Sequence, residues 1–343
     1  MIENLTARQV REVIEGRGCT RIPVLYDLWI YPSVMEKETA QVEALLEKYP
    51  RDVQEVFLQF PDMYDAPDED GDYRWAAAGG KHREGVGLDA DVVIEDWEDA
   101  EKFFERFPSP DYPGLIPEFH KDGKRYLLAR WWYLYFERLW SLRGMENALT
   151  DFYLYPEEIH RLFGKLTDFY VRAMERAKEE LDADGFFASD DIGTQNSPFF
   201  SLEIFREFFK PYYKRLCDKA HELGMHFWLH TCGNVELFLE DFIEIGLDVI
   251  HPIQKGTMDE MKIADTYGDR ICILAGFDVQ QAIPFGTPEE VRKEVRHLID
   301  TFSRGQGRFM LTMGNGTTPD WKKESLEALY EETCTYGCRK HEK

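Results

Sequence analysis

The chain has 343 residues, of which 65 are acidic and 41 are Lys or Arg, so its formal net charge is −24 at pH 7. This acidic excess disfavours a nucleic-acid groove or a basic membrane-binding helix, and 43% apolar residues are enough for a large core. The length exceeds a typical domain of about 100–200 residues and fits one large α/β barrel of about 250 residues or more.

Neither a secretion signal nor a membrane span is expected. Residues 1–17 carry charges throughout, and no uncharged apolar run approaches the roughly 18 residues that cross a bilayer. The six cysteines are spread over the chain, unlike those of a small disulfide-rich scaffold. We therefore expect a soluble, cytoplasmic protein that binds neither nucleic acid nor membrane.

Short apolar runs alternate with amphipathic segments along the chain. The runs are apolar on both faces and bounded by Gly, Pro or Asp, as in parallel strands that are buried on both sides. The predicted strands are Arg21–Leu28, Val53–Leu58, Arg125–Tyr133, Gly185–Ser189, Met225–His230, Asp248–Pro252, Ile271–Ala275 and Arg308–Thr312. The predicted helices are Pro156–Asp182, Leu202–Leu223, Val235–Ile245 and Pro288–Ser303.

Eight strands that alternate with helices predict a single-domain (β/α)8 TIM barrel over residues 1–343, with an N-terminal extension. A doubly wound open sheet is the alternative, but neither G-x-G-x-x-G after the first strand nor G-x-x-x-x-G-K-[ST] occurs. The segment around 59–117 is long, acidic and rich in Pro, Gly and Trp. We expect it to form an insertion or lid, because long loops in compact domains are usually functional.

Candidate site residues follow the predicted strands, because the active site of such a barrel lies at the carboxyl ends of its strands. Glu137, Asp190 and Asp191 are the predicted catalytic acids. We expect one of the two adjacent aspartates to act in the site and the other to support the loop. The predicted substrate-binding residues are Tyr26, Trp29, Trp131, Arg138, Gln195, Asp278 and Asn315. For the aromatic residues among them, the alternative is that they simply pack in the core.

The sharpest local feature is the pair His230 and Cys232, which follows a predicted strand. Residues at i and i+2 on a strand end can point to the same side. One imidazole and one thiolate suit Zn²⁺, and a hydrogen-bonded His beside an ordinary buried Cys is the alternative. A catalytic zinc needs three protein ligands and an open position, and the spacing does not identify the third ligand.

Several segments resemble the uroporphyrinogen decarboxylase superfamily. They are Asp184–Gln195, Phe205–Leu216, Trp228–Asn234 and Asp248–Gln254. The resemblance covers most of residues 120–337 and implies a (β/α)8 barrel. This superfamily contains cofactor-free porphyrinogen decarboxylases and zinc-dependent methyltransferases that transfer methyl groups to or from a corrinoid protein or a thiol.

The chain is more similar to the methyltransferase branch. The decarboxylases hold substrate carboxylates with arginines near the first strand, whereas Pro23–Pro32 contains no arginine and includes Asp27. The methyltransferases bind zinc through His-x-Cys, matched by His230 and Cys232, and through a further Cys after the final strand.

Asn315 stands where that further Cys is expected. Asn is a poor zinc ligand beside a thiolate. The resemblance therefore leaves two outcomes open: a carboxylate such as Asp191, Glu137 or Asp278 completes the site, or zinc does not bind.

The resemblance implies a corrinoid-protein-dependent methyltransferase of the O-demethylase type, with a methoxylated aromatic as the expected methyl donor. Its implied cofactors are zinc and a cobalamin or other corrinoid on a partner protein, which needs a wide opening at the strand ends. The chain could also form a homodimer, which the sequence does not decide. The alternatives are a metal-free decarboxylase or lyase, with Arg138 facing an acid in the pocket, and a non-catalytic barrel that binds a tetrapyrrole or corrinoid.

Overall fold

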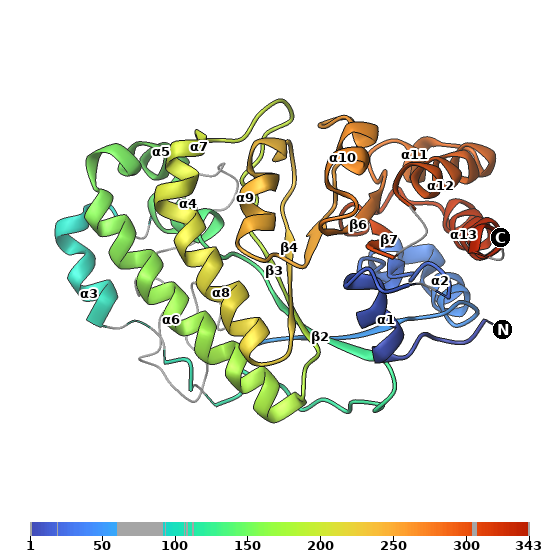
Figure 1. The fold of residues 1–343 in the computed structure, drawn as a ribbon, viewed down its shortest axis with the longest axis horizontal. Helices are drawn as coiled ribbons and strands as arrows, with labels where there is room; N and C mark the ends of the chain where they lie inside the picture. Colours follow the sequence, from blue (N-terminus) through green and yellow to red (C-terminus); the bar gives the residue numbers. More distant parts are fainter. Residues whose placement is uncertain are drawn as a thin grey trace.

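Seven parallel strands form one curved sheet, in which they lie side by side in chain order (Figure 1). The computed structural model describes residues 2–18, 20–59, 92, 94–105, 107, 109–111, 113–303 and 307–341. The strands are β1 Val53–Phe57, β2 Tyr126–Trp131, β3 Gly185–Ser189, β4 His226–His230, β5 Val249–His251, β6 Cys272–Phe277 and β7 Phe309–Met313. All residues of β2 to β7 are buried, as the apolar runs predict.

Helices alternate with these strands, and the long helices α6 and α8 pack side by side along the sheet (Figure 1). The helices are α1 Ala7–Ile14, α2 Thr39–Leu46, α3 Ala100–Glu105, α4 Phe136–Arg143, α5 Met145–Leu154, α6 Pro156–Leu181, α7 Leu202–Ile204, α8 Lys210–Glu222, α9 Leu239–Glu244, α10 Glu260–Tyr267, α11 Ala282–Phe285, α12 Pro288–Phe302 and α13 Lys323–His341. The short helical turns are η1 Tyr26–Leu28, η2 Pro32–Glu38, η3 Trp97–Asp99, η4 Phe205–Phe209 and η5 Glu236–Phe238. The four predicted helices are confirmed, two of them with a short turn joined to the helix.

The first predicted strand, Arg21–Leu28, is not a strand. Val24 makes one isolated parallel bridge with Leu311 of β7. Leu25 then leaves the extended conformation, with φ −125° and ψ 26°, and the chain enters η1. The described residues therefore form seven strands, and the predicted eighth position is occupied by a single bridge.

Asp52, directly before β1, connects this bridge to the other edge of the sheet. Its buried carboxylate accepts the N–H groups of Leu5 and Val24, both at 2.8 Å, and pairs with Arg21 at 2.5 Å. Since Val24 also pairs with Leu311, side-chain hydrogen bonds link the start of β1 to the segment beside β7. This contact closes the curve of the sheet where a strand ladder is missing.

The predicted insertion around 59–117 is described only in part, because residues 60–91, 93, 106, 108 and 112 lie outside the described residues. Its described part contains η3 and α3 and contacts the core. The indole N–H of Trp97 donates to Asp151 at 2.9 Å, and Arg143 pairs with the same carboxylate at 2.7 Å. Within the described ranges, no helix has both the length and the apolar character needed to cross a bilayer.

Candidate metal centre

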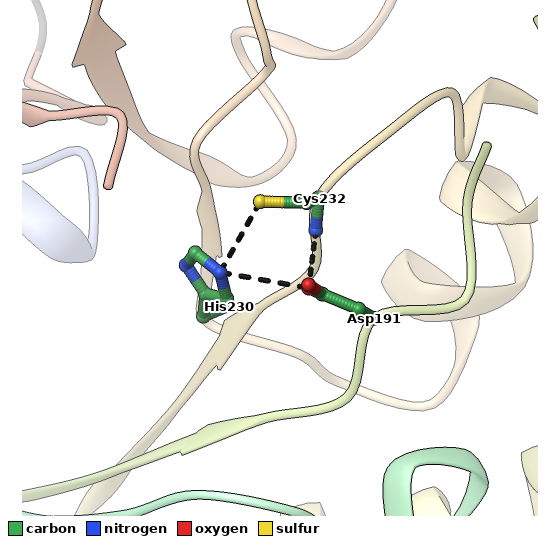
Figure 2. Close-up of side chains that lie close together, drawn as sticks. All are labelled: Asp191, His230 and Cys232. Carbon is green, nitrogen blue, oxygen red and sulfur yellow. Dashed lines mark hydrogen bonds and ion pairs between the residues drawn. The ribbon is translucent and has the colours of Figure 1, made fainter. Parts of the chain in front are cut away.

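Three side chains that can bind a metal meet beyond the carboxyl ends of β3 and β4 (Figure 2). Asp191 follows β3, His230 ends β4, and Cys232 lies two residues further on. Nε2 of His230 is 3.3 Å from Sγ of Cys232 and 3.5 Å from Oδ1 of Asp191. One ligand atom from each residue lies within 4.8 Å of the other two, and the described part of the chain holds no second such group.

The two distances from His230 fit a tetrahedral metal site. Zinc binds imidazole nitrogen and carboxylate oxygen at about 2.0–2.2 Å and thiolate sulfur at about 2.3 Å, so its ligand atoms lie roughly 3.4–3.6 Å apart. The distances from His230 to Cys232 and to Asp191 are close to this range. Three protein ligands leave a fourth position for water or substrate, as a catalytic zinc requires.

Backbone contacts hold the two ligand loops together. The N–H of Cys232 donates to Oδ1 of Asp191 at 2.7 Å, and the N–H of Gly233 donates to Gln254 at 2.7 Å. Gly233 has φ +83°, and a Cβ on it would lie 2.4 Å from the backbone of Gly193. Glycine is therefore required for the loops after β3 and β4 to approach this closely.

His251, at the end of the predicted strand Asp248–Pro252, is a buried residue of the site to which the sequence assigned no role. It ends β5, where it is the register partner of His230 on β4. Nδ1 of His251 is 2.7 Å from Nδ1 of His230, and its Nε2 is 2.9 Å from the carbonyl oxygen of Met313. Its place at a strand end is predictable from the sequence, but its contact with His230 depends on the register of β4 and β5.

Burial controls the protonation of the site. It lowers the pKa of His230, and together with the neighbouring His230 ring it lowers the pKa of His251 further. Burial, followed by the nearby charges of Asp191 and Glu137, raises the pKa of the Cys232 thiol. The metal-free site therefore holds neutral imidazoles and a thiol, and a bound cation would favour the thiolate.

The two adjacent acids divide between structure and site. Asp190 is fully buried, and its carboxylate accepts the Tyr213 hydroxyl at 2.6 Å and the N–H groups of Tyr135 and Glu137 at 3.1 and 2.9 Å. Burial raises the pKa of Asp190 to about 6. Asp190 thus supports the start of α4, whereas Asp191 faces the metal position.

Glu137 lies buried beside Asp190 and Asp191. The hydroxyl of Ser189 donates to its carboxyl group. Burial, and then the charges of the two aspartates, raise the pKa of Glu137 well above its usual value. The raised pKa favours the protonated form of Glu137, which is the form in which a general acid acts.

The aromatic wall of the site contains Trp29 and Trp132, whereas Trp131 faces away. The Trp29 ring lies 5.2 Å from the His230 ring and stacks on Trp132 at 5.5 Å. Trp131 packs instead on Tyr170 of α6 at 4.8 Å. Neighbouring residues of a strand point to opposite faces, so a shift of one position exchanges the two tryptophans.

Three of the predicted substrate-binding residues have other surroundings. Tyr26 is fully buried, and its hydroxyl bonds with that of Thr333 at 2.9 Å. Arg138 is buried, with its guanidinium 5.5 Å from the centre of the Tyr133 ring. Gln195 is exposed on the loop after β3.

Asp278 and Asn315 line a cavity that Cys232 also borders. Nδ2 of Asn315 is 3.8 Å from Sγ of Cys232, so Asn315 lies next to the predicted ligand pair. Asp278 accepts the backbone N–H of Gln280 at 2.8 Å. The cavity measures about 50 Å³ and borders one of the three ligand residues.

Comparisons with known proteins agree on one family. The family model described as uroporphyrinogen decarboxylase (URO-D) matches residues 139–336, more than half of the chain. A methylated-thiol–coenzyme M methyltransferase from Methanosarcina mazei is 29% identical over 158 residues, 46% of this chain and 41% of that protein. A uroporphyrinogen decarboxylase from Xanthomonas oryzae pv. oryzae is 27% identical over 187 residues, 51% of this chain and 49% of that protein. The chain therefore spans less than half the length of these two relatives.

A solved structure extends the likeness in fold to nearly the whole chain. A methyltransferase from Methanosarcina mazei superposes with a TM-score of 0.60 at 14% identity, over 97% of this chain and 99% of that one. At that identity the likeness concerns the fold alone. By the match over residues 139–336, this chain belongs to the uroporphyrinogen decarboxylase family, and its similarity to the methylated-thiol–coenzyme M methyltransferase places it towards the methyltransferase branch.

Proposed function

We propose that this chain is a zinc-dependent methyltransferase that moves a methyl group from a small donor to the corrinoid of a partner protein. The observation that carries the proposal is the group Asp191, His230 and Cys232, whose ligand atoms lie within 4.8 Å of one another. The names of a relative and of a solved structure from Methanosarcina mazei, both methyltransferases, add support.

The side chains suggest a division of labour. Asp191, His230 and Cys232 would hold zinc, which when bound supplies a Lewis acid for the donor's leaving heteroatom. Glu137 would provide the proton that this heteroatom takes up. Trp29 and Trp132 would exclude water from the reacting atoms.

The transfer balances as a displacement at carbon. The bond between the methyl carbon and the donor heteroatom breaks, and the heteroatom keeps the bonding pair. The reduced cobalt of the partner's corrinoid supplies the pair for the new bond to carbon. The chain itself contributes orientation and a proton, so it needs no redox group of its own.

The size of the cavity bears on the identity of the donor. A water needs about 10–15 Å³ of such space, so the roughly 50 Å³ cavity beside Cys232 has room for a group of a few heavy atoms. A methylated thiol fits this space better than a methoxylated aromatic ring. The Methanosarcina mazei relative is named for a methylated thiol, and we propose this donor class as the first to test.

The metal-free lyase receives less support. It gives no role to the group Asp191, His230 and Cys232, whose ligand atoms lie within 4.8 Å of one another. The hypothesis of a non-catalytic barrel assigns the same site to binding and differs from the methyltransferase hypothesis in expecting no turnover. Metal content and methyl transfer therefore separate the three hypotheses.

The first experiment is a metal analysis of the untagged protein by plasma mass spectrometry. We expect about one zinc per chain in the wild type, its loss in Cys232→Ser, and its retention in Cys334→Ser, a matched cysteine variant on α13. The zinc-loaded protein is then given methylated thiols and free cob(I)alamin, whose methylation is followed by absorbance. Absence of metal after anaerobic zinc loading would contradict the proposal.

A further inference from the structure

The protons of the His230–His251 pair can be assigned from their partners. The Met313 carbonyl oxygen, 2.9 Å from Nε2 of His251, can only accept a hydrogen bond, so this Nε2 carries the hydrogen. A neutral imidazole has only one N–H group, which leaves Nδ1 of His251 as an acceptor. Nδ1 of His230, 2.7 Å away, must therefore be the donor.

The surroundings of His251 favour its neutral ring. His251 is fully buried and His230 is 5% exposed. Within the described ranges, the hydrogen-bond partners of His251 are the ring of His230 and the carbonyl of Met313, and neither is an acid. An imidazolium at this position would be a buried charge without a counter-ion, which is costly.

In the neutral form that binds a metal, the assignment leaves the other nitrogen of His230 as a lone pair. That atom, Nε2, lies 3.3 Å from Sγ of Cys232 and 3.5 Å from Oδ1 of Asp191 (Figure 2). The lone pair is thus directed to the place where the three ligand atoms meet. The opposite tautomer would put a hydrogen there and block a metal.

Aromatic packing keeps the His251 ring in this orientation. The Trp29 ring stacks on it at 5.0 Å with an interplanar angle of 18°, and Phe187 contacts it edge-on at 6.0 Å and 85°. Thr317 donates to the carbonyl of Trp29 from both its hydroxyl, at 2.9 Å, and its N–H, at 3.1 Å. The ring therefore cannot turn without moving the residues on both of its sides.

We propose that His251 is a positioning residue that holds His230 in the Nδ1–H tautomer and so presents its Nε2 to the metal. The metal-ligating role of that nitrogen rests on the proposed function. Metal-binding histidines usually donate their second N–H to a carboxylate, a carbonyl or water, and loss of such a partner costs about 10- to 100-fold in metal affinity. Here an imidazole that is itself fixed by a backbone carbonyl takes that place.

The tautomer can be tested on the wild-type protein without metal. Long-range ¹H–¹⁵N spectra of the imidazoles distinguish a protonated Nδ1 from a protonated Nε2, and His230→Gln assigns the signals. We expect the hydrogen of His230 on Nδ1 and that of His251 on Nε2. A hydrogen on Nε2 of His230 would overturn the inference.

Zinc affinity tests the consequence. His251→Leu fills much of the ring volume without an acceptor and should weaken zinc binding by about 10- to 100-fold. His251→Asn offers a carbonyl oxygen near the position of Nδ1 and should retain most of the affinity. His226→Leu is the matched control, because His226 is also buried on β4 but bonds to Tyr126 at 3.0 Å. Near-UV circular dichroism verifies that each variant is folded.

The outcomes separate this inference from the proposed function. Wild-type affinity in His251→Leu, or equal loss in the Leu and Asn variants, would overturn the role of His251. A wild-type chain with the Nδ1–H tautomer that binds zinc but transfers no methyl group would support that role and contradict the methyltransferase.

Discussion

Two neighbouring carboxylates at the end of β3 show how surroundings decide the role of a residue. The Asp190 side chain is fully buried and accepts three hydrogen bonds, whereas the Asp191 side chain is 39% exposed and lies 3.5 Å from His230. A buried acceptor that holds backbone N–H groups contributes mainly to stability. A partly exposed carboxylate beside an imidazole and a thiol is available to a metal.

Alanine substitutions of the two acids should therefore affect different properties, namely stability for Asp190 and zinc affinity for Asp191. We expect Asp190→Ala to lose roughly 2–4 kcal/mol of unfolding free energy, because three donors lose their acceptor. We expect Asp191→Ala to lose about 1 kcal/mol or less but to bind zinc about 100-fold more weakly. Urea unfolding and zinc titration measure the two effects. Equal loss of stability in both variants would contradict the assignment.

Asp27 predicts how stability depends on pH. Burial raises the pKa of its carboxyl to about 7, against about 3.9 in an unfolded chain. Between these values the folded state keeps a proton that the unfolded state has lost. The stability that Asp27 contributes is thus fully present below about pH 4 and is lost as the pH rises to about 7.

Asp27→Asn should remove this dependence. We expect the stability of the wild type, relative to the variant, to fall from pH 4 to pH 7 in urea titrations. Asp122→Asn is the control, because hydrogen bonds from the backbone and side chain of Arg125 lower the pKa of Asp122 to about 2 despite partial burial. Its contribution is lost only as the pH falls below about 4. A wild type and Asp27→Asn with parallel profiles would disprove the prediction.

Among the secondary-structure elements, one carboxylate links the two edges of the sheet. Asp52 joins the segment beside β7 to the start of β1, and its ion pair with Arg21 is buried. Breaking a buried pair leaves an uncompensated charge, so Asp52→Ala should cost about 3–5 kcal/mol of unfolding free energy. Asp168 forms an ion pair with Arg215, and the Asp168 side chain is 71% exposed. Asp168→Ala should therefore cost about 1 kcal/mol or less of unfolding free energy. Similar losses in urea unfolding would show that the edge contact adds no special stability.

Seven strands and the principal helices could be predicted because apolar runs that are buried on both faces leave a pattern in the sequence. The run Arg21–Leu28 carries the same pattern but turns into η1, since β pairing depends on partners that the run itself does not contain. The sequence predicts Trp131 in the site, whereas Trp132 lies there, because one position on a strand end reverses the side that a residue faces.

The ligand pair was found because both residues lie close together in the sequence. Asp191 was one of three candidates for the third ligand, and its place depends on the loops that meet at Gly193 and Gly233. His251 depends on the register between β4 and β5. Such contacts between separate strands carry no local signal.

At the scale of the whole molecule, the centre joins distant parts of the chain. Asp191 and Cys232 are 41 residues apart in sequence, and Trp29, which packs on His251, is held by Thr317 near the other end of the chain. An unfolded chain does not keep these groups together. A metal that binds here therefore binds the folded state in preference to the unfolded state.

Zinc should accordingly stabilise the whole fold. At a free concentration 100 times its Kd, a ligand that binds only the folded state adds about 2.7 kcal/mol, which should raise the melting temperature by roughly 4 °C for a chain of this size. Calorimetry at several zinc concentrations should show this rise, EDTA should reverse it, and Asp191→Ala and Cys232→Ser should abolish it. A rise that persists in both variants would locate the binding elsewhere, because either substitution leaves the remaining two ligands without the third that a closed coordination shell needs.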